Sequence, residues 1–271
     1  MNKKRKKIGL VLGSGGARGL AHLGVLKVLE KENIKIDYLV GVSMGSLIAA
    51  YYALGLNLEK LEAEAIKMTR TRAIRKLLDL SDPRKSIIRG QKIKKYIEEL
   101  IGDSSFSDIK IPLQIIATNL SNGAEVILSQ GNLIQAIQAS ISVPGILAPV
   151  KINNKYLVDG GVIDPTPIDI PKRMGADIII GVDLTIQRNI KFTKDPSLIM
   201  TLMQSYDIIR TQAVQFNINK VRDNKKNIIL IKPEPRSTID SFKFHKIREF
   251  IKAGEKEAYK NLSKIKKLIN S

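Results

Sequence analysis

The alternation of short apolar runs with longer segments of helical periodicity most constrains what this chain can fold into. The expected strands cover residues 7–12, 36–40, 113–118, 125–128, 156–158, 177–183 and 227–231. The expected helices cover residues 17–32, 44–54, 58–79, 91–101, 131–140, 197–221 and 244–268. This order predicts a three-layer α/β/α protein, in which helices cover both faces of a mostly parallel central sheet.

The length of the chain favours one domain covering residues 1–271. With 271 residues, of which 44% are hydrophobic, the chain is long enough to bury one sizeable core. The span from Val143 to Pro171 holds five prolines and is expected to be irregular backbone over the sheet edge. The basic stretch 56–102 is expected to form either a cap or ordinary covering helices. The basic helical region of about 190–271 is expected to pack on a core of about 7–185.

The composition excludes several kinds of chemistry. The chain has no cysteine, which rules out disulfides, thiolate metal sites and cysteine nucleophiles, and which fits a reducing cytoplasm. It has only two histidines, so a histidine pair that holds a metal is not expected. No metal and no other cofactor is therefore expected.

The net charge of +19 predicts attraction to anionic surfaces such as acidic phospholipid or nucleic acid. The basic segment 2–7 precedes an apolar run of about five residues, which is too short for the core of a signal peptide. No apolar stretch approaches the length of a membrane-spanning helix. A cytoplasmic protein with peripheral contact to the inner membrane face is expected.

The segment Gly41–Gly45 reads G-V-S-M-G and lies between an expected strand and an expected helix. This is the context of a nucleophile elbow, in which a strained turn exposes the serine Oγ above the sheet. A side chain in place of either Gly41 or Gly45 would collide with the strand or the helix. Ser43 is therefore the candidate nucleophile.

The segment Gly13–Gly19 reads G-S-G-G-A-R-G and closes the first expected strand. A glycine-rich turn from strand to helix presents free backbone N–H groups and binds anions. The dinucleotide fingerprint fails in both registers, and no Gly-Lys-Ser/Thr follows as a P-loop requires. An oxyanion hole with donors from Gly15, Gly16 or Ala17 remains. Arg18 would then hold the loop in shape or add positive charge, and the alternative is a tight turn with a surface arginine.

A serine nucleophile needs a proton acceptor, and the two histidines are poor candidates. His22 follows the glycine-rich loop on an expected helix, where a buried structural role is favoured. His245 lies among charged residues, where a solvated surface role is favoured. The order Ser43, an aspartate and then His245 is nevertheless that of the α/β-hydrolase triad, so this triad stays as an alternative.

Asp159 is the better candidate base. It ends the short apolar run 156–158 and precedes Gly160 and Gly161, which allow close approach of another backbone such as the elbow. Partial burial would raise the pKa of this carboxyl towards useful basicity. The alternative is an Asp-Gly-Gly turn that stabilises only itself.

Taken together, these motifs resemble those of the patatin-like phospholipases. The family signature is a G-G-x-R-G loop, a G-x-S-x-G motif and a D-G-G motif in that order, here at 15–19, 41–45 and 159–161. The A-S-x-x-x-P block at Ala139–Pro144 is also similar to this family. The sequence L-A-H-L-G-V-L at Leu20–Leu26 resembles the bacterial neuropathy-target-esterase-like branch.

The resemblance implies a Ser–Asp dyad without histidine, formed by Ser43 and Asp159, and an oxyanion hole at Gly15–Arg18. It also implies hydrolysis of acyl esters of phospholipids or lysophospholipids through an acyl-enzyme intermediate, without a metal. This chain departs from the family pattern at Ser14, where many members have glycine, and at Asp164, where Asn-Pro is common after D-G-G.

Two other functions are consistent with the sequence. The first is a Ser-His-Asp esterase that acts on small soluble esters. The second is a basic nucleic-acid-binding or regulatory protein on a hydrolase fold, which the charge supports. No helix-turn-helix, zinc or aromatic RNA-binding pattern is present, so no nucleic-acid partner is expected.

Overall fold

The computed structural model describes residues 5–69, 79, 86–185, 195–220, 226–234 and 244–271. Within these residues an eight-stranded sheet runs through the molecule in the order β5-β6-β3-β2-β1-β7-β8, and β4 pairs with β3 beside this path. The strands are β1 (Ile8–Leu12), β2 (Tyr38–Val42), β3 (Leu113–Asn119), β4 (Glu125–Leu128), β5 (Val150–Ile152), β6 (Lys155–Asp159), β7 (Ile178–Val182) and β8 (Ile228–Ile231).

The centre of the sheet is parallel and one edge is antiparallel. Strands β3, β2, β1, β7 and β8 form parallel pairs, with Leu10 of β1 opposite Leu39 of β2 and Ile180 of β7. Strands β4 and β6 pair antiparallel with β3, and β5 pairs antiparallel with β6. The expected mostly parallel α/β sheet is therefore confirmed.

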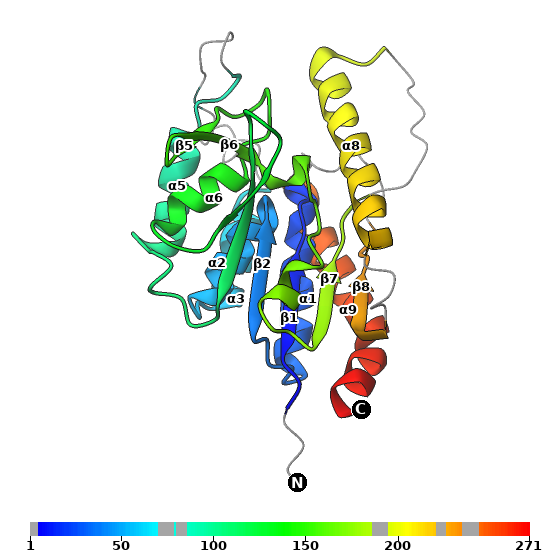
Figure 1. Cartoon of the computed structure of the whole chain (residues 1–271). Coiled ribbons are helices and arrows are strands. Elements are labelled where there is room, and N and C mark those ends of the chain that lie inside the picture. Colours follow the sequence, from blue (N-terminus) through cyan, green and yellow to red (C-terminus); the bar gives the residue numbers. More distant parts are fainter. Residues whose placement is uncertain (1–4, 70–78, 80–85, 186–194, 221–225, 235–243) are drawn as a thin grey trace.

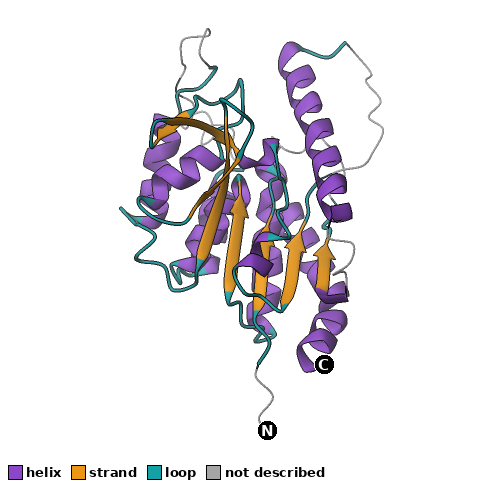
Figure 2. Cartoon of the chain, in the orientation of Figure 1, coloured by secondary structure: helices purple, strands orange, loops and turns teal. Residues whose placement is uncertain are grey.

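The helices connect the strands and cover the sheet (Figure 2). The α-helices are α1 (Ala21–Lys31), α2 (Met44–Ala53), α3 (Leu58–Lys67), α5 (Gln91–Ile101), α6 (Leu133–Ser140), α7 (Ile170–Arg173), α8 (Leu198–Lys220) and α9 (Ile247–Asn270). The 3₁₀ helices are η1 (Gly16–Leu20), η2 (Gly160–Val162) and η5 (Phe244–Lys246). In Figure 1 the terminal helix α9 lies beside α1, and side chains from both helices belong to the same core.

Alternation along each strand sends side chains to opposite faces of the sheet. On β1, Leu10 belongs to the larger core beneath α1, α2 and α9, which includes residues from Ile8 to Ile265. Val11 faces the other way and packs with Val40, Ile116 and Ile170 of α7. Both faces of the central strands are thus buried, which explains their continuous apolar runs.

The strands expected from the sequence all occur, and one further strand is present. The structure adds β5 within the span Val143–Pro171, so that this span is not wholly irregular. β5 has three residues, of which the central Lys151 is exposed, and so short a pattern does not predict a strand. The helix expected at 58–79 ends at Lys67, and its remainder falls mainly outside the described residues.

The stretch 56–102, where either a cap or covering helices were expected, contains α3 and α5 in its described part. Their buried side chains Leu61 and Ile97 belong to the main core. This packing favours covering helices for α3 and α5. Residues 70–78 and 80–85 between them lie outside the described residues.

Candidate functional site

Ser43 lies at the turn between β2 and α2, with φ 55° and ψ −125°. A positive φ is rare for a residue with a side chain, and such strain is typical of a nucleophile elbow. A Cβ on Gly41 would lie 2.5 Å from Ser46 Cα, and a Cβ on Gly45 would lie 2.0 Å from Leu12 O. Neither backbone atom can move aside cheaply, so both positions require glycine, as the sequence predicts.

Asp159 lies at the end of β6 and contacts Ser43 directly. The Oγ of Ser43 donates a hydrogen bond of 2.7 Å to Oδ2 of Asp159. The backbone N–H of Gly161 donates a hydrogen bond of 2.7 Å to Oδ1, which fixes the carboxylate plane. Asp159 is 0% exposed. Burial raises the pKa of this carboxyl, opposed by the hydrogen bonds from Ser43 and Gly161, and the carboxylate is thereby more basic than an exposed one.

The A-S block, which begins in the last turn of α6, links the two residues. The Oγ of Ser140 accepts a hydrogen bond from the backbone N–H of Ser43 and donates one to Ile116 O. The carbonyl oxygen of Ser142 accepts the backbone N–H of Asp159 at 2.9 Å. The resemblance identified this block, but nothing in the sequence indicated that it joins the elbow to the candidate base.

The glycine after Asp159 permits a close approach between backbones. A Cβ on Gly160 would lie 2.3 Å from Ile116 O on β3. The nearest backbone is therefore that of β3, not the elbow that the sequence suggested, and the elbow approaches this position with the Val42 side chain at 3.1 Å. This contact seats Asp159 between β3 and the turn that holds Ser43.

The glycine-rich loop lies beside the elbow. Gly13 and Ser14 donate their N–H groups to Val182 O and Pro165 O, so the start of the loop is held on both sides. η1 then begins at Gly16, whose φ is 57°. The first N–H groups of a helix have no partner within it, and the described residues give those of Gly15 and Gly16 no acceptor elsewhere. These backbone N–H groups can therefore donate hydrogen bonds to a bound anion.

Arg18 is buried, so the alternative of a surface arginine is wrong. Its side chain is 1% exposed. Its Nε donates to Gly15 O at 3.3 Å, and its Nη2 pairs with Oδ1 of Asp207 at 3.3 Å. Arg18 thus holds the loop in shape and tethers it to α8.

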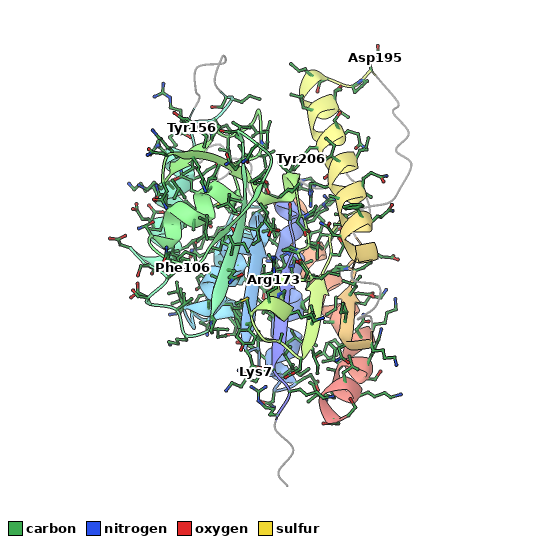
Figure 3. The ribbon with its side chains drawn as sticks, viewed as in Figure 1. Lys7, Phe106, Tyr156, Arg173, Asp195 and Tyr206 are labelled. Atoms are coloured by element: carbon green, nitrogen blue, oxygen red, sulfur yellow. The ribbon has the colours of Figure 1, made fainter. Side chains whose placement is uncertain are left out.

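Helix α8 contributes residues that the sequence did not single out. Arg210 donates a hydrogen bond of 2.5 Å to Ser14 O and pairs with Asp207 at 2.8 Å. Tyr206 lies on the side of α8 that faces the sheet (Figure 3), with its buried hydroxyl beside Gly161 and Asp159. Burial, followed by the charge of Asp159, raises the pKa of Tyr206 well above its usual value. No local motif marks these residues.

The two histidines take the roles that the sequence favoured. The imidazole of His22 is fully buried, and its Nε2 lies 2.7 Å from Gly13 O. Burial lowers the pKa of His22 to about 4, so the ring is neutral and supports the loop. His245 is exposed on η5, and no hydrogen bond between described residues connects it to Ser43 or Asp159.

A cavity of about 300 Å³ opens beside Ser43. Gly16 and Ser43 belong to its lining, and side chains of α2, α3 and α5, among them Leu47, Leu61 and Ile97, form part of the rest. The lining is almost entirely apolar and mostly aliphatic. A larger hollow of about 760 Å³ between α1, α3 and α9 has a mainly polar and charged lining and includes neither Ser43 nor Asp159. The aliphatic cavity is the one placed to take a substrate of Ser43.

The chain is similar to known proteins in its sequence. An NTE family protein of Mycobacterium tuberculosis is 36% identical over 178 residues, which are 66% of this chain and 49% of that protein. A lysophospholipase nte1 of Aspergillus fumigatus is 36% identical over 181 residues, which are 66% of this chain and 12% of that protein. The chain therefore matches about half the length of the mycobacterial relative and a small part of the fungal one.

Solved structures share the fold. VipD from Legionella pneumophila matches 92% of this chain and 67% of its own, with a TM-score of 0.53 and 15% identity. ExoU of Pseudomonas aeruginosa, in its complex with SpcU, matches 99% of this chain and 53% of its own, with a TM-score of 0.52 and 16% identity. The family model described as patatin-like phospholipase matches residues 10–172, which include the elbow, the glycine-rich loop and Asp159. The chain belongs to the patatin-like phospholipase family.

Proposed function

We propose that this protein is a serine esterase that cleaves acyl ester bonds of phospholipids or lysophospholipids, with Ser43 as nucleophile and Asp159 as base. The observation that carries the proposal is the 2.7 Å hydrogen bond from Ser43 Oγ to Asp159 Oδ2, with Ser43 in the lining of an aliphatic cavity. A nucleophile and a base within hydrogen-bond reach meet the geometric requirement for covalent catalysis. The reaction needs no metal and no other cofactor.

In the first half of the reaction, Ser43 Oγ attacks the ester carbonyl while Asp159 Oδ2 takes its proton. The carbonyl oxygen becomes an oxyanion, to which the N–H groups of the Gly15–Arg18 loop donate hydrogen bonds. The C–O bond to the alcohol then breaks. Asp159 returns the proton to the leaving oxygen, and the acyl group stays on Ser43 as an ester.

In the second half, Asp159 takes a proton from water, and the resulting hydroxide attacks the acyl-Ser43 carbonyl. The same loop stabilises the second oxyanion. The bond between the acyl carbon and Ser43 Oγ breaks, Asp159 returns the proton to Ser43, and the free fatty acid leaves. The raised pKa of Asp159 suits it to both proton transfers.

The aliphatic cavity supports a lipid substrate over a small polar ester. Its lining offers apolar contacts to an acyl chain but few partners for polar groups. The relative from Aspergillus fumigatus bears the name lysophospholipase, which agrees with this substrate class.

No helix among the described residues is long and apolar enough to cross a membrane. We place the reaction in the cytoplasm, in one domain that contacts the inner membrane face from outside the bilayer.

The test is labelling with a fluorophosphonate followed by an activity panel of phospholipids, lysophospholipids and soluble esters. Wild type is expected to be labelled, Ser43→Ala is expected to stay folded without label, and lipid esters are expected to be the better substrates. Activity that resists a chelator is also expected. Labelling that persists in Ser43→Ala would refute the nucleophile, and a preference for short soluble esters would refute the lipid substrate.

A further inference from the structure

The outer face of α8 is apolar and exposed. Leu198 is 74% exposed and Ile209 is 54% exposed. The exposed apolar side chains of this helix are Leu198, Met200, Leu202, Ile208, Ile209 and Phe216. Single exposed apolar side chains are ordinary on protein surfaces, but several on one face of a helix form a patch of the kind that marks a contact surface.

Leu198, Leu202 and Ile209 lie on one line along α8 and are called the outer stripe here. Their spacings of four and seven residues place them on one face, because an α-helix has about 3.6 residues per turn. The exposed Ser205 and Gln212 lie beside this line and are uncharged. The outer stripe is thus an apolar row with neutral polar neighbours.

The charged side chains of α8 that the structure describes both face the body of the protein. Asp207 pairs with Arg18 and Arg210, and Arg210 also donates to Ser14 O. The described outer face of α8 is therefore without charge, in a chain in which 26% of the residues are charged. This departure from the rest of the surface indicates a partner that is apolar where it meets the helix.

The position of α8 brings the outer stripe close to the candidate site. Its inner face contacts the glycine-rich loop through Arg210, and Tyr206 lies beside Asp159. In Figures 1 and 2 the first turns of α8 extend beyond the carboxyl ends of the strands, the sheet edge at which Ser43 lies. A surface that meets the outer stripe would lie next to this edge.

We propose that the outer stripe docks on the surface of an anionic lipid bilayer, where the proposed lipid hydrolase would reach its substrate. The proposal rests on that proposed function. A net charge of +19 attracts an anionic bilayer and repels a second copy of the same chain, so charge complementarity favours the bilayer as occupant. Transfer of the stripe side chains from water into the interface adds an apolar contribution that salt does not screen.

The experiment measures co-sedimentation of the full chain with vesicles of equimolar phosphatidylcholine and phosphatidylglycerol, at low and at high salt. All variants carry Ser43→Ala, so that hydrolysis does not alter the vesicles. The stripe variant is Leu202→Gln with Ile209→Gln, which keeps the charge and the helix propensity. The matched control is Leu120→Gln with Ile127→Gln, because these apolar residues are also exposed but lie on or beside β3 and β4.

At high salt, where the attraction of the lysines to the bilayer is screened, the partition coefficient of the stripe variant is expected to be at least about tenfold lower than that of the parent. The control is expected to partition as the parent does. Equal partitioning of the stripe variant and parent, or an equal loss in the control, overturns the proposal. So does a parent dimer in sedimentation velocity that the stripe substitutions convert to monomer, because the occupant is then a second copy.

A separate measurement distinguishes this proposal from the proposed function. With Ser43 restored, the stripe variant is expected to hydrolyse a soluble ester at the wild-type rate, because its substitutions lie outside the site. If wild type hydrolyses no ester, the proposed function fails, whereas the vesicle result with Ser43→Ala still decides the role of the stripe. If the stripe variant alone loses soluble-ester turnover, the outer stripe acts on the site and not through lipid, which overturns the docking proposal.

Discussion

Arg210 donates a hydrogen bond of 2.5 Å to the carbonyl oxygen of Ser14, across 196 residues of sequence. The contact is buried and joins α8 to the glycine-rich loop that follows β1. A second link from Asp207 to Arg18 reaches the same loop. The geometry of the candidate oxyanion donors therefore depends on a helix that lies outside the residues matched by the family model.

Asp159→Asn is expected to reduce turnover by roughly 10²–10⁴-fold, because an amide cannot take the proton from Ser43. Ser43→Ala is expected to abolish turnover. The double variant is expected to be no worse than Ser43→Ala alone, since residues that act as a unit are not additive. The measurement is kcat/KM with a soluble ester, with circular dichroism as the check on folding.

His245→Ala is the matched control for the dyad. The exposed position of His245 predicts nearly full turnover in this variant. A folded His245→Ala variant as slow as Asp159→Asn would instead favour the Ser-His-Asp triad that the chain order allows.

Gly16→Ala is expected to reduce kcat by about 10²–10³-fold while KM changes little. A Cβ at φ 57° strains the loop, so that its backbone N–H groups no longer point at the oxyanion. The oxyanion exists only after attack, so kcat is affected and KM is not. Steady-state kinetics on a soluble ester separate the two parameters. A change in KM with constant kcat would mean that Gly16 affects only substrate binding, through the cavity that it lines, and is not part of the oxyanion hole.

The sequence predicted those parts of the fold that have local signals. The strand β4 was placed at the observed residues 125–128 and the helix α5 at 91–101, because apolar periodicity reports directly on burial. Ser43 and Asp159 were singled out by short motifs with required glycines. The structure brings these residues within 2.7 Å of each other, a relation that no local pattern contains.

The contribution of α8 could not be predicted from the sequence. Tyr206, Asp207 and Arg210 fall in a helix whose apolar residues point both inward and outward, so its periodicity does not indicate which face is buried. Their function in the site depends on the placement of α8 against the glycine-rich loop and against Gly161, which are distant from α8 in the sequence. Only tertiary structure carries that information.

Arg210→Gln is expected to move the acidic limb of the pH profile of kcat/KM to higher pH. Burial raises the pKa of Asp159, and the positive charge of Arg210 opposes this shift. Loss of that charge leaves the carboxyl with a still higher pKa, so that the basic form appears only at higher pH. A purely structural role of Arg210 would lower kcat/KM equally at every pH. Arg248→Gln, which removes an exposed arginine of α9, is expected to leave the profile unchanged.

Asp164→Asn is expected to stabilise the protein more at pH 8 than at pH 5. Burial raises the pKa of Asp164 to about 7, against hydrogen bonds from Asn217 and Thr166 that lower it, while Asp169 and Glu125 add to the rise. The folded chain therefore holds this proton more tightly than the unfolded chain, whose aspartate has a pKa of 3.8. Between these two values the free energy of unfolding falls by about 1.4 kcal/mol per pH unit as pH rises, and it is constant above the upper value.

An asparagine cannot ionise, so the variant lacks this loss of stability. The gain of Asp164→Asn over wild type is expected to grow by roughly 3 kcal/mol between pH 5 and pH 8. Urea unfolding of both proteins at the two pH values measures it, because titrations common to both cancel in the difference. Asp103→Asn, at an exposed aspartate, is expected to give the same small difference at both pH values. A gain for Asp164→Asn that does not change with pH would mean that Asp164 is ionised in the folded protein throughout this range, which its burial beside Asp169 and Glu125 opposes.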